Sequence, residues 1–220
     1  MCRRRGGWQC GGFGHDAVPM CNHYQNHPEA IPTWREYIGA LPYDAPFSET
    51  RIDVWPRRMG EVVRTVDGAR VAGEMAWGVP LTLPGKRPGT TVTKYVTNVR
   101  NLASPFWANM LKRPAHRCLV PFSRFAEPKL GPDGKGTKDE HWFRVADREV
   151  AAFAGLWRPT PVGDAYAFLT CAPNPLVAPL HPKAMPVILA EDDYATWLDG
   201  DAEAAAALAV PFPSQLMVVE

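Results

Sequence analysis

The chain has 220 residues, of which 46% are hydrophobic and 21% are charged, and its formal net charge is +1. This length supports one sizeable hydrophobic core, and the near-zero charge excludes a generally basic nucleic-acid-binding protein. No apolar run approaches the roughly 20 residues that span a bilayer, so we expect a cytoplasmic protein with no membrane partner. The five cysteines are scattered and form no C-x-x-C pair, which argues against disulfides and a zinc site. We predict no metal and no cofactor.

Residues 1–19 differ in composition from the rest of the chain. They are rich in glycine, include three arginines and show no periodic apolar pattern. Such a segment cannot bury enough apolar surface to offset its ordering entropy. We therefore interpret residues 1–20 as a disordered extension or a mis-assigned start, and residues 21–220 as one folded domain. If translation starts at Met20, removal of this methionine leaves Cys21 with a free α-amine. From residue chemistry alone, an internal Met-Cys dipeptide is the better-supported alternative.

Capping and turn residues define the expected elements in the first half of the chain. Thr33-Trp34-Arg35-Glu36 is a capping-box pattern, and Ser104-Pro105 is typical of an N-cap followed by the first helical position. The expected elements are, in chain order, a helix from about Thr33 to Ile38 or Gly39, an irregular segment over residues 51–60, a strand over 71–81 that ends in a turn at Gly78 and Pro80, a strand over 92–96, and a helix over 106–111.

The second half of the chain is dominated by runs rich in aromatic and β-branched residues. We expect strands over residues 118–121, 141–145, 150–157, 165–171 and 185–189, a mobile polar loop over 130–140, and helices over 191–198 and 202–209. Because the strands follow one another instead of alternating strictly with helices, the sequence predicts the α+β class with a mainly antiparallel sheet.

Four polar residues stand out against apolar or turn surroundings: Asn98, Arg100, Glu127 and His181. Asn98 and Arg100 are two residues apart at the end of a predicted strand, so strand alternation places them on the same face. Each residue also has an ordinary structural explanation. Asn98 can cap a turn, Arg100 can form a surface ion pair, Glu127 can be an exposed acid at a strand end, and His181 can be a buried histidine. Considered singly, the structural explanation is the better supported for all four.

Together with Cys21, these residues lie in five stretches that resemble the SRAP family, the SOS response-associated peptidase domain. The stretches are MCNHYQ (20–25), AWGVPL (76–81), TNVRNLAS (97–104), HRCLVPFSRFAEP (116–128) and TCAPNPLVAPLHPKAMPVIL (170–189). They occur in order over most of the chain, and the last two contain long motifs that are very unlikely to occur together by chance. The resemblance implies a single domain with a mainly antiparallel, barrel-like β core and flanking helices.

The resemblance also implies a reaction with abasic sites in single-stranded DNA during the DNA damage response. An N-terminal cysteine offers an amine, which forms a Schiff base with the sugar aldehyde, and a thiol, which closes a thiazolidine ring. By the match, Cys21 forms this covalent DNA–protein crosslink and Glu127 acts as the general acid/base. His181 assists proton transfer at the sugar hydroxyl, and Asn98 orients Cys21. With residues 1–20 attached, the α-amine is blocked.

Four further residues are DNA-binding candidates by the same match. Arg100 would hold a phosphate next to the lesion through its guanidinium group. Trp77 would stack on a neighbouring base, although a role as a core aromatic is at least equally well supported. Asn22 and His23 stand where many family members carry Gly-Arg, so a basic contact with DNA is lost or replaced by His23.

Two alternative functions use the same residues. The first is a thiol peptidase, including an autoproteolytic one, in which Cys21, His181 and Glu127 hydrolyse a peptide bond. The second is a non-catalytic module that binds single-stranded DNA through a basic groove. In each case we expect a monomer.

Overall fold

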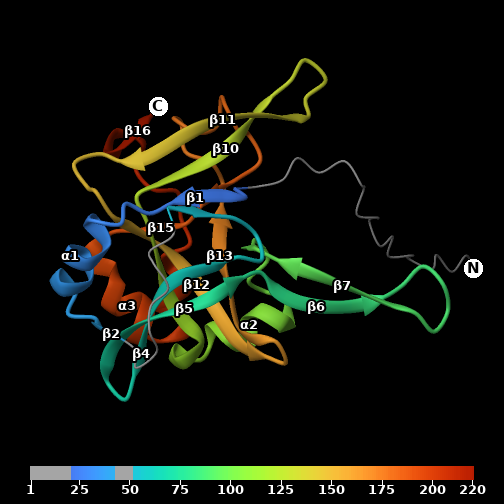
Figure 1. The fold of residues 1–220 in the computed structure, drawn as a ribbon, viewed down its shortest axis with the longest axis horizontal. Coiled ribbons are helices and arrows are strands. Elements are labelled where there is room, and N and C mark those ends of the chain that lie inside the picture. The colour runs from blue at the N-terminus through green and yellow to red at the C-terminus, as the bar shows by residue number, and fades with distance from the viewer. Residues whose placement is uncertain (1–20, 43–51) are drawn as a thin grey trace, which may run out of the picture.

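The computed structural model describes residues 21–42 and 52–220 of the chain. Strands are the main elements, and short helices flank them, which confirms the predicted α+β class (Figure 1). Within the described residues, no helix is both long enough and apolar enough to cross a membrane.

In the described part of the chain, five strands close into a barrel at the centre of the molecule (Figure 1). In spatial order they are β4 (Met59–Val66), β5 (Ala69–Trp77), β13 (Gly163–Cys171), β12 (Ala151–Thr160) and β9 (Arg117–Phe122). The pairing of β5 with β13 is parallel and the others are antiparallel. The parallel pairing joins the two ends of the sheet, so these strands keep no open edge.

Short strands extend the barrel sheet. They are β2 (Leu41–Pro42) beside β5, β8 (Asn98–Val99) and β14 (Met185–Pro186) beside β13, and β15 (Ile188–Leu189) beside β12. Because β8 pairs in parallel with β13, Asn98 lies opposite Phe168 of the barrel wall.

A second, antiparallel sheet lies across one end of the barrel, at the top of Figure 1. Its order is β16 (Met217–Val219), β11 (Gly136–Val145), β10 (Arg124–Leu130), β1 (His23–Gln25) and β3 (Asp53–Val54). Strand β1 therefore lies between β10 and β3, with His23 opposite Ala126. This pairing holds the chain that follows Cys21 against the strand that carries Glu127.

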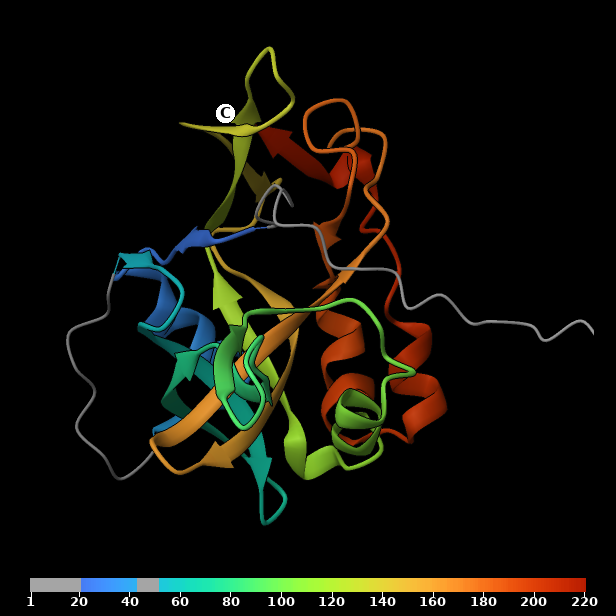
Figure 2. The same cartoon turned by 90° about the vertical axis from the view of Figure 1, so that its right-hand side faces the viewer.

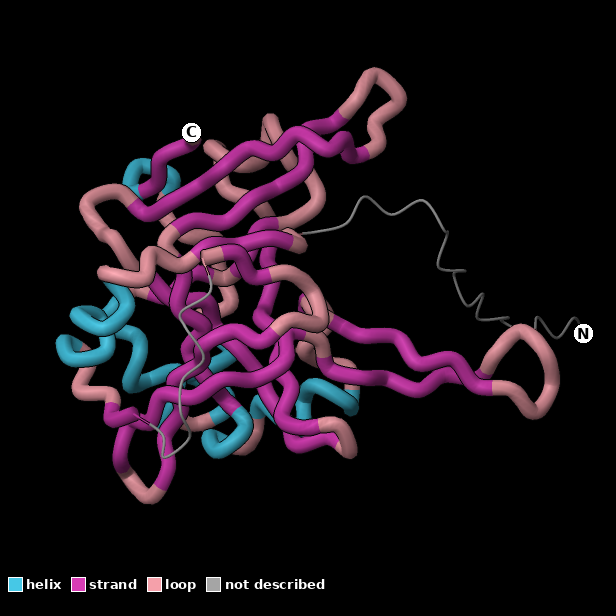
Figure 3. The backbone as a smooth tube through the Cα atoms, viewed as in Figure 1, coloured by secondary structure: helices cyan, strands magenta, loops and turns pink. Residues whose placement is uncertain are grey.

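A two-stranded hairpin, β6 (Val79–Pro84) and β7 (Thr91–Val96), projects from the body of the molecule (Figures 1 and 3). It follows β5 directly and leads into β8. The sharp change of direction between β5 and β6 occurs at Gly78, whose φ of +132° is favoured only for glycine.

Helices cover the outer side of the barrel (Figure 2). The α-helices of the described residues are α1 (Ala30–Tyr37), α2 (Pro105–Leu111), α3 (Tyr194–Asp199) and α4 (Ala202–Ala207), with 3-10 turns η1 (Pro114–His116), η2 (Glu191–Asp193) and η3 (Ser214–Leu216). Trp34, Trp107 and Trp197 bury their rings in the core between these helices and the barrel.

Alternation along β12 separates two hydrophobic cores. Ala152 and Ala154 face the helices, whereas Ala151 and Phe153 face an aromatic core that fills the barrel and extends to the second sheet. In that aromatic core, Phe153 stacks on Phe122 with ring centroids 3.8 Å apart. Both faces of β12 are thus buried, which explains why its sequence is an almost continuous apolar run.

The predicted helix over 106–111 and the strands over 118–121, 150–157 and 165–171 correspond to α2, β9, β12 and β13, with Pro105 in the first turn of α2. The capping-box prediction is wrong in position, because α1 begins at Ala30 and Thr33 lies inside it. Pro32 is tolerated there since a proline in the first turn of a helix lacks only an N–H that would be unpaired.

Four other boundaries differ from the prediction. The segment 51–60 contains β3 and the start of β4, and the run 71–81 divides between β5 and β6. The loop predicted over 130–140 is limited to residues 131–135, because β10 and β11 pair up to Leu130 and Gly136. The run 185–189 forms two strands that pair with different neighbours. Strand pairing sets these boundaries, and in the 130–140 segment it overrides a polar, glycine-rich sequence.

Replacing Gly60 with alanine is expected to lower the free energy of unfolding by about 1–3 kcal/mol, because overpacking of a dense interior forces neighbours to shift. A Cβ at Gly60 would overlap the hydroxyl oxygens of Tyr24 and Tyr166, which share a 2.5 Å hydrogen bond. Urea unfolding measures the loss. In a Tyr166→Phe background one of these oxygens is absent, so Gly60→Ala should lower the free energy of unfolding by less. An equal loss in both backgrounds would contradict the packing argument.

Candidate active site

Cys21 lies two residues before the start of β1, and its side chain is fully buried. The thiol donates to the His23 carbonyl oxygen at an Sγ–O distance of 3.8 Å. Asn98 approaches from β8 and donates from Nδ2 to the Cys21 carbonyl oxygen at 3.3 Å, and to Thr97 Oγ1 at 3.0 Å. The structure therefore brings Asn98 against the main chain of Cys21, although they are far apart in sequence.

Glu127 and His181 meet in the same buried region. Each is only 1% exposed, and His181 Nδ1 lies 3.7 Å from Glu127 Oε2. The same nitrogen lies 2.9 Å from the Ala184 carbonyl oxygen, which can only accept, so Nδ1 carries the proton of the neutral ring. Among the described residues, neither Glu127 oxygen nor His181 Nε2 has a hydrogen-bond partner of normal geometry.

Burial determines the protonation of this pair. It raises the pKa of Glu127 well above its ordinary value, although the nearby backbone N–H of Cys21 acts in the opposite direction. Burial also lowers the pKa of His181, and its contact with the Ala184 carbonyl does not reverse this. Both shifts favour the neutral forms near neutral pH. The contact is therefore between a carboxylic acid and a neutral imidazole, and is not an ion pair.

The thiol of Cys21 is also held in its neutral form. Burial raises its pKa well above the ordinary value, and the negative charge of Glu140 raises it further. The arrangement is one buried acid, one neutral imidazole base and one cysteine. Within the described residues, no three His, Cys, Asp or Glu side chains are grouped so that they could hold a metal ion.

The sequence model of one family, described as SOS response associated peptidase (SRAP), matches residues 20–220. The chain belongs to the SRAP family. This confirms the resemblance given by the sequence motifs, and the membership supports a function related to DNA damage. No curated protein matches the chain.

The SRAP fold is also found in solved structures. A protein from Bordetella bronchiseptica is 28% identical with a TM-score of 0.68, and the match covers 90% of this chain and 98% of that one. A protein from Bacteroides thetaiotaomicron is 18% identical with a TM-score of 0.70 and 90% coverage of both chains. A phage-related protein from Bordetella bronchiseptica is 18% identical with a TM-score of 0.64, covering 92% of this chain and 93% of that one. The last two likenesses concern the fold alone.

Two of the predicted DNA-binding residues of this SRAP chain, Arg100 and Trp77, differ in how far they are exposed. Arg100 is exposed at the surface, where its Nη1 donates to the Lys183 carbonyl oxygen at 2.7 Å. The prediction that Trp77 stacks on a base is not supported, because the ring is fully buried, stacks on Phe168 and donates from Nε1 to the Thr97 carbonyl oxygen. Its role in the SRAP fold is that of a core aromatic.

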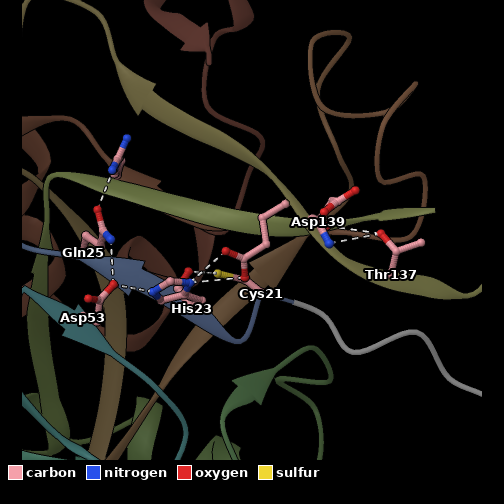
Figure 4. A network of polar contacts seen from close by, with 8 residues as sticks. Cys21, His23, Gln25, Asp53, Thr137 and Asp139 are labelled. Atoms are coloured by element: carbon pink, nitrogen blue, oxygen red, sulfur yellow. Dashed lines mark hydrogen bonds and ion pairs between the residues drawn. The ribbon is translucent and has the colours of Figure 1, made fainter. Parts of the chain in front are cut away.

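The predicted DNA contact of His23 is likewise corrected. Its side chain is buried and its ring nitrogens face Asp53 and Glu140, so it does not present a free cation to a phosphate (Figure 4). Asn22, beside it, is half-buried. Asp53 and Glu140 were missed in the sequence because they lie in segments expected to be irregular, and no local pattern marks a partner that pairing brings from another strand.

Proposed function

We propose that this SRAP protein captures abasic sites in single-stranded DNA by a covalent thiazolidine crosslink through Cys21, once Cys21 is the N-terminal residue. The observation that carries the proposal is the setting of the Cys21 main chain. Its nitrogen lies near the Glu127 carboxyl group, and its carbonyl oxygen accepts from Asn98. A site built around the backbone of a cysteine suits a reaction that needs the α-amine as well as the thiol.

The reaction requires no oxidant. The amine attacks the aldehyde carbon of the ring-opened deoxyribose, and loss of one water gives an imine. The thiol sulfur then adds to the imine carbon while its proton passes to the nitrogen, which closes the ring. Glu127, kept protonated by burial, donates a proton to the departing hydroxyl group. His181 carries its proton on Nδ1, so the lone pair on its unpartnered Nε2 is available to accept a proton, which suits proton transfer at the sugar hydroxyl.

The β6–β7 hairpin supplies the local basic patch that DNA binding needs. Residues 79–100 contain no acidic residue, and Lys86, Arg87 and Lys94 are exposed along the hairpin. The hairpin leads directly into Asn98 and the exposed Arg100 (Figure 1). Positive charge on a projecting arm that ends at the site supports contact with the phosphates on either side of a lesion.

Cys21 has a free α-amine only when it is the N-terminal residue of the protein. In the full chain the Cys21 nitrogen belongs to the peptide bond with Met20 and cannot form an imine. We propose that residues 1–20 are absent from or removed in the active protein, and the start of the family match at residue 20 supports this. The intact mass of the protein made in its own host tests this directly.

The geometry gives less support to a thiol peptidase. Such an enzyme needs a base that hydrogen-bonds to the sulfur and lowers the pKa of the thiol. The Cys21 thiol instead contacts a carbonyl oxygen, and burial together with the charge of Glu140 raises its pKa.

Incubating an abasic single-stranded oligonucleotide with protein that starts at Cys21 should give a shifted band that survives heating in denaturing electrophoresis. The Cys21→Ser variant should give no such band, because it lacks the thiol that closes the ring. Cys171→Ser is the matched control, since Cys171 is a free cysteine outside the site, and it should keep the band.

Absence of the band with protein whose N-terminus is verified as Cys21 would refute the crosslinking proposal. Salt-dependent binding that does not discriminate between abasic and intact DNA would instead support the non-catalytic binding module.

A further inference from the structure

His23 occupies an unusual position between two carboxylates (Figure 4). Its Nε2 lies 2.7 Å from Asp53 Oδ1 on β3, and its Nδ1 lies 3.0 Å from Glu140 Oε2 on β11. A neutral imidazole has one N–H and can donate to only one of them, whereas an imidazolium donates to both. The contacts are therefore complete only when His23 carries a positive charge.

Neighbouring groups support that charged form. Partial burial raises the pKa of Asp53, but hydrogen bonds from Gln25 and His23 outweigh it, so the pKa lies below its ordinary value and Asp53 is ionised. The ring of Trp55 stacks on His23 with centroids 3.7 Å apart and planes 17° apart. Trp142 packs its ring at 73° to the imidazole, at a centroid distance of 4.7 Å. Aromatic faces stabilise a cation and fix the ring in place.

This cluster is joined to Cys21 in two ways. The Cys21 thiol donates to the main-chain oxygen of His23 itself. In addition, Glu140, which binds the imidazole of His23, is close enough for its negative charge to raise the pKa of the Cys21 thiol. One carboxylate thus acts on both the histidine and the nucleophile. Removal of the histidine charge would leave Glu140 uncompensated beside the sulfur.

We propose that His23 is a positioning residue for Cys21, which as an imidazolium binds and neutralises Glu140 and so maintains the reactivity of the thiol. The proposal rests on the proposed function of Cys21 as the nucleophile. Among the described residues, Asp53 from β3 and Glu140 from β11 contact the His23 ring, and Gln25 on its own strand binds Asp53. The guanidinium of Arg124 on β10 lies 4.5 Å from the centre of the Trp142 ring and also acts on Asp53.

The test measures how fast iodoacetamide alkylates Cys21 from pH 6 to 9, by mass spectrometry of the Cys21 peptide. It uses the full chain and the form that starts at Cys21, whose fold is checked by circular dichroism. At pH 7 the alkylation rate of His23→Gln should be about fivefold to tenfold lower than that of the wild type, because an uncompensated negative charge nearby reduces the fraction of reactive thiolate. His23→Arg keeps a cation that stacks on tryptophan and should stay within about twofold.

A second charge change separates this role from a purely structural one. Glu140→Gln should raise the alkylation rate, and in that background His23→Gln should have little further effect. If His23 served only to hold the strand, His23→Gln would loosen β1 and speed alkylation instead. The exposed His27→Gln is the control and should match the wild type.

Equal rates for the wild type and a folded His23→Gln, or a faster rate in that variant, would overturn the proposal. This readout needs no DNA. A chain that shows the predicted alkylation pattern but does not crosslink abasic DNA would therefore refute the proposed function and leave the role of His23 intact.

Discussion

Replacing Arg117 with alanine is expected to lower the free energy of unfolding by about 3–5 kcal/mol, because it leaves several buried carbonyl groups without a donor. Arg117 is fully buried at the start of β9. Its guanidinium donates to the carbonyl oxygens of Leu111, Trp197 and Gly200, at 2.9, 2.9 and 2.7 Å. These carbonyls belong to the C-terminal ends of α2 and α3, where a cation is also favoured by the helix dipole.

Urea unfolding followed by circular dichroism measures this loss. Arg113→Ala removes an exposed arginine from the same segment and should change the stability by less than about 0.5 kcal/mol. The loss of stability in Arg117→Lys should lie between those of Arg117→Ala and Arg113→Ala, because a single ammonium group cannot reach the ends of two helices. A loss below about 1 kcal/mol in Arg117→Ala would show that the contacts contribute little.

Arg117 opens the RCLVP stretch, one of the most specific sequence motifs of the chain. Its position in the structure explains the motif by packing, since the guanidinium ties β9 to two helices on the outside of the barrel. The same strand leads through Phe122 into β10 and Glu127. Arg117 at the start of this stretch therefore supports the fold, and Glu127, further along the same stretch, is the residue that we propose as the acid.

Glu127→Gln should slow crosslinking by about 100-fold or more, the usual contribution of a general acid/base, while the fold stays intact. Glutamine keeps the shape of the protonated side chain but has no proton to transfer. Burial raises the pKa of Glu127, so the wild-type acid is present at neutral pH and is lost as the pH rises through that raised value. The wild-type rate should fall on that alkaline side, and the low rate of Glu127→Gln should lack this dependence.

Single-turnover crosslinking from pH 5 to 9 gives both rates, and the exposed Glu203→Gln serves as a matched control. Stability provides a separate check. Because the folded-state pKa of Glu127 is raised, ionisation destabilises the native state, and the wild type should lose stability relative to Glu127→Gln as the pH rises. If Glu127→Gln crosslinks at the wild-type rate at every pH, the acid/base role of Glu127 is wrong.

Part of the site could be predicted from sequence, through motifs and not through spacing. The stretches around Cys21, Asn98, Glu127 and His181 identified the family, and the structure brings these residues together around the Cys21 main chain. Considered singly, each had an ordinary structural explanation. Their distances depend on the parallel pairing of β8 with β13 and the antiparallel pairing of β1 with β10, which no local pattern encodes.

The sequence by itself determined the α+β class, the strand character of the long apolar runs and the proline-opened helix at Pro105. These features follow from local backbone preferences and from the spacing of apolar residues, which act over a few positions. They are also the parts of the fold where local preference and tertiary packing agree.

Only the tertiary structure decided how Cys21 is surrounded. It buried Trp77 in the core, enclosed His23 between Asp53 and Glu140, and brought the charge of Glu140 close to the thiol. The physical reason is that burial and charge depend on which strands pair across the sheet. Such pairing joins residues more than a hundred positions apart, as it does for His23 and Glu140.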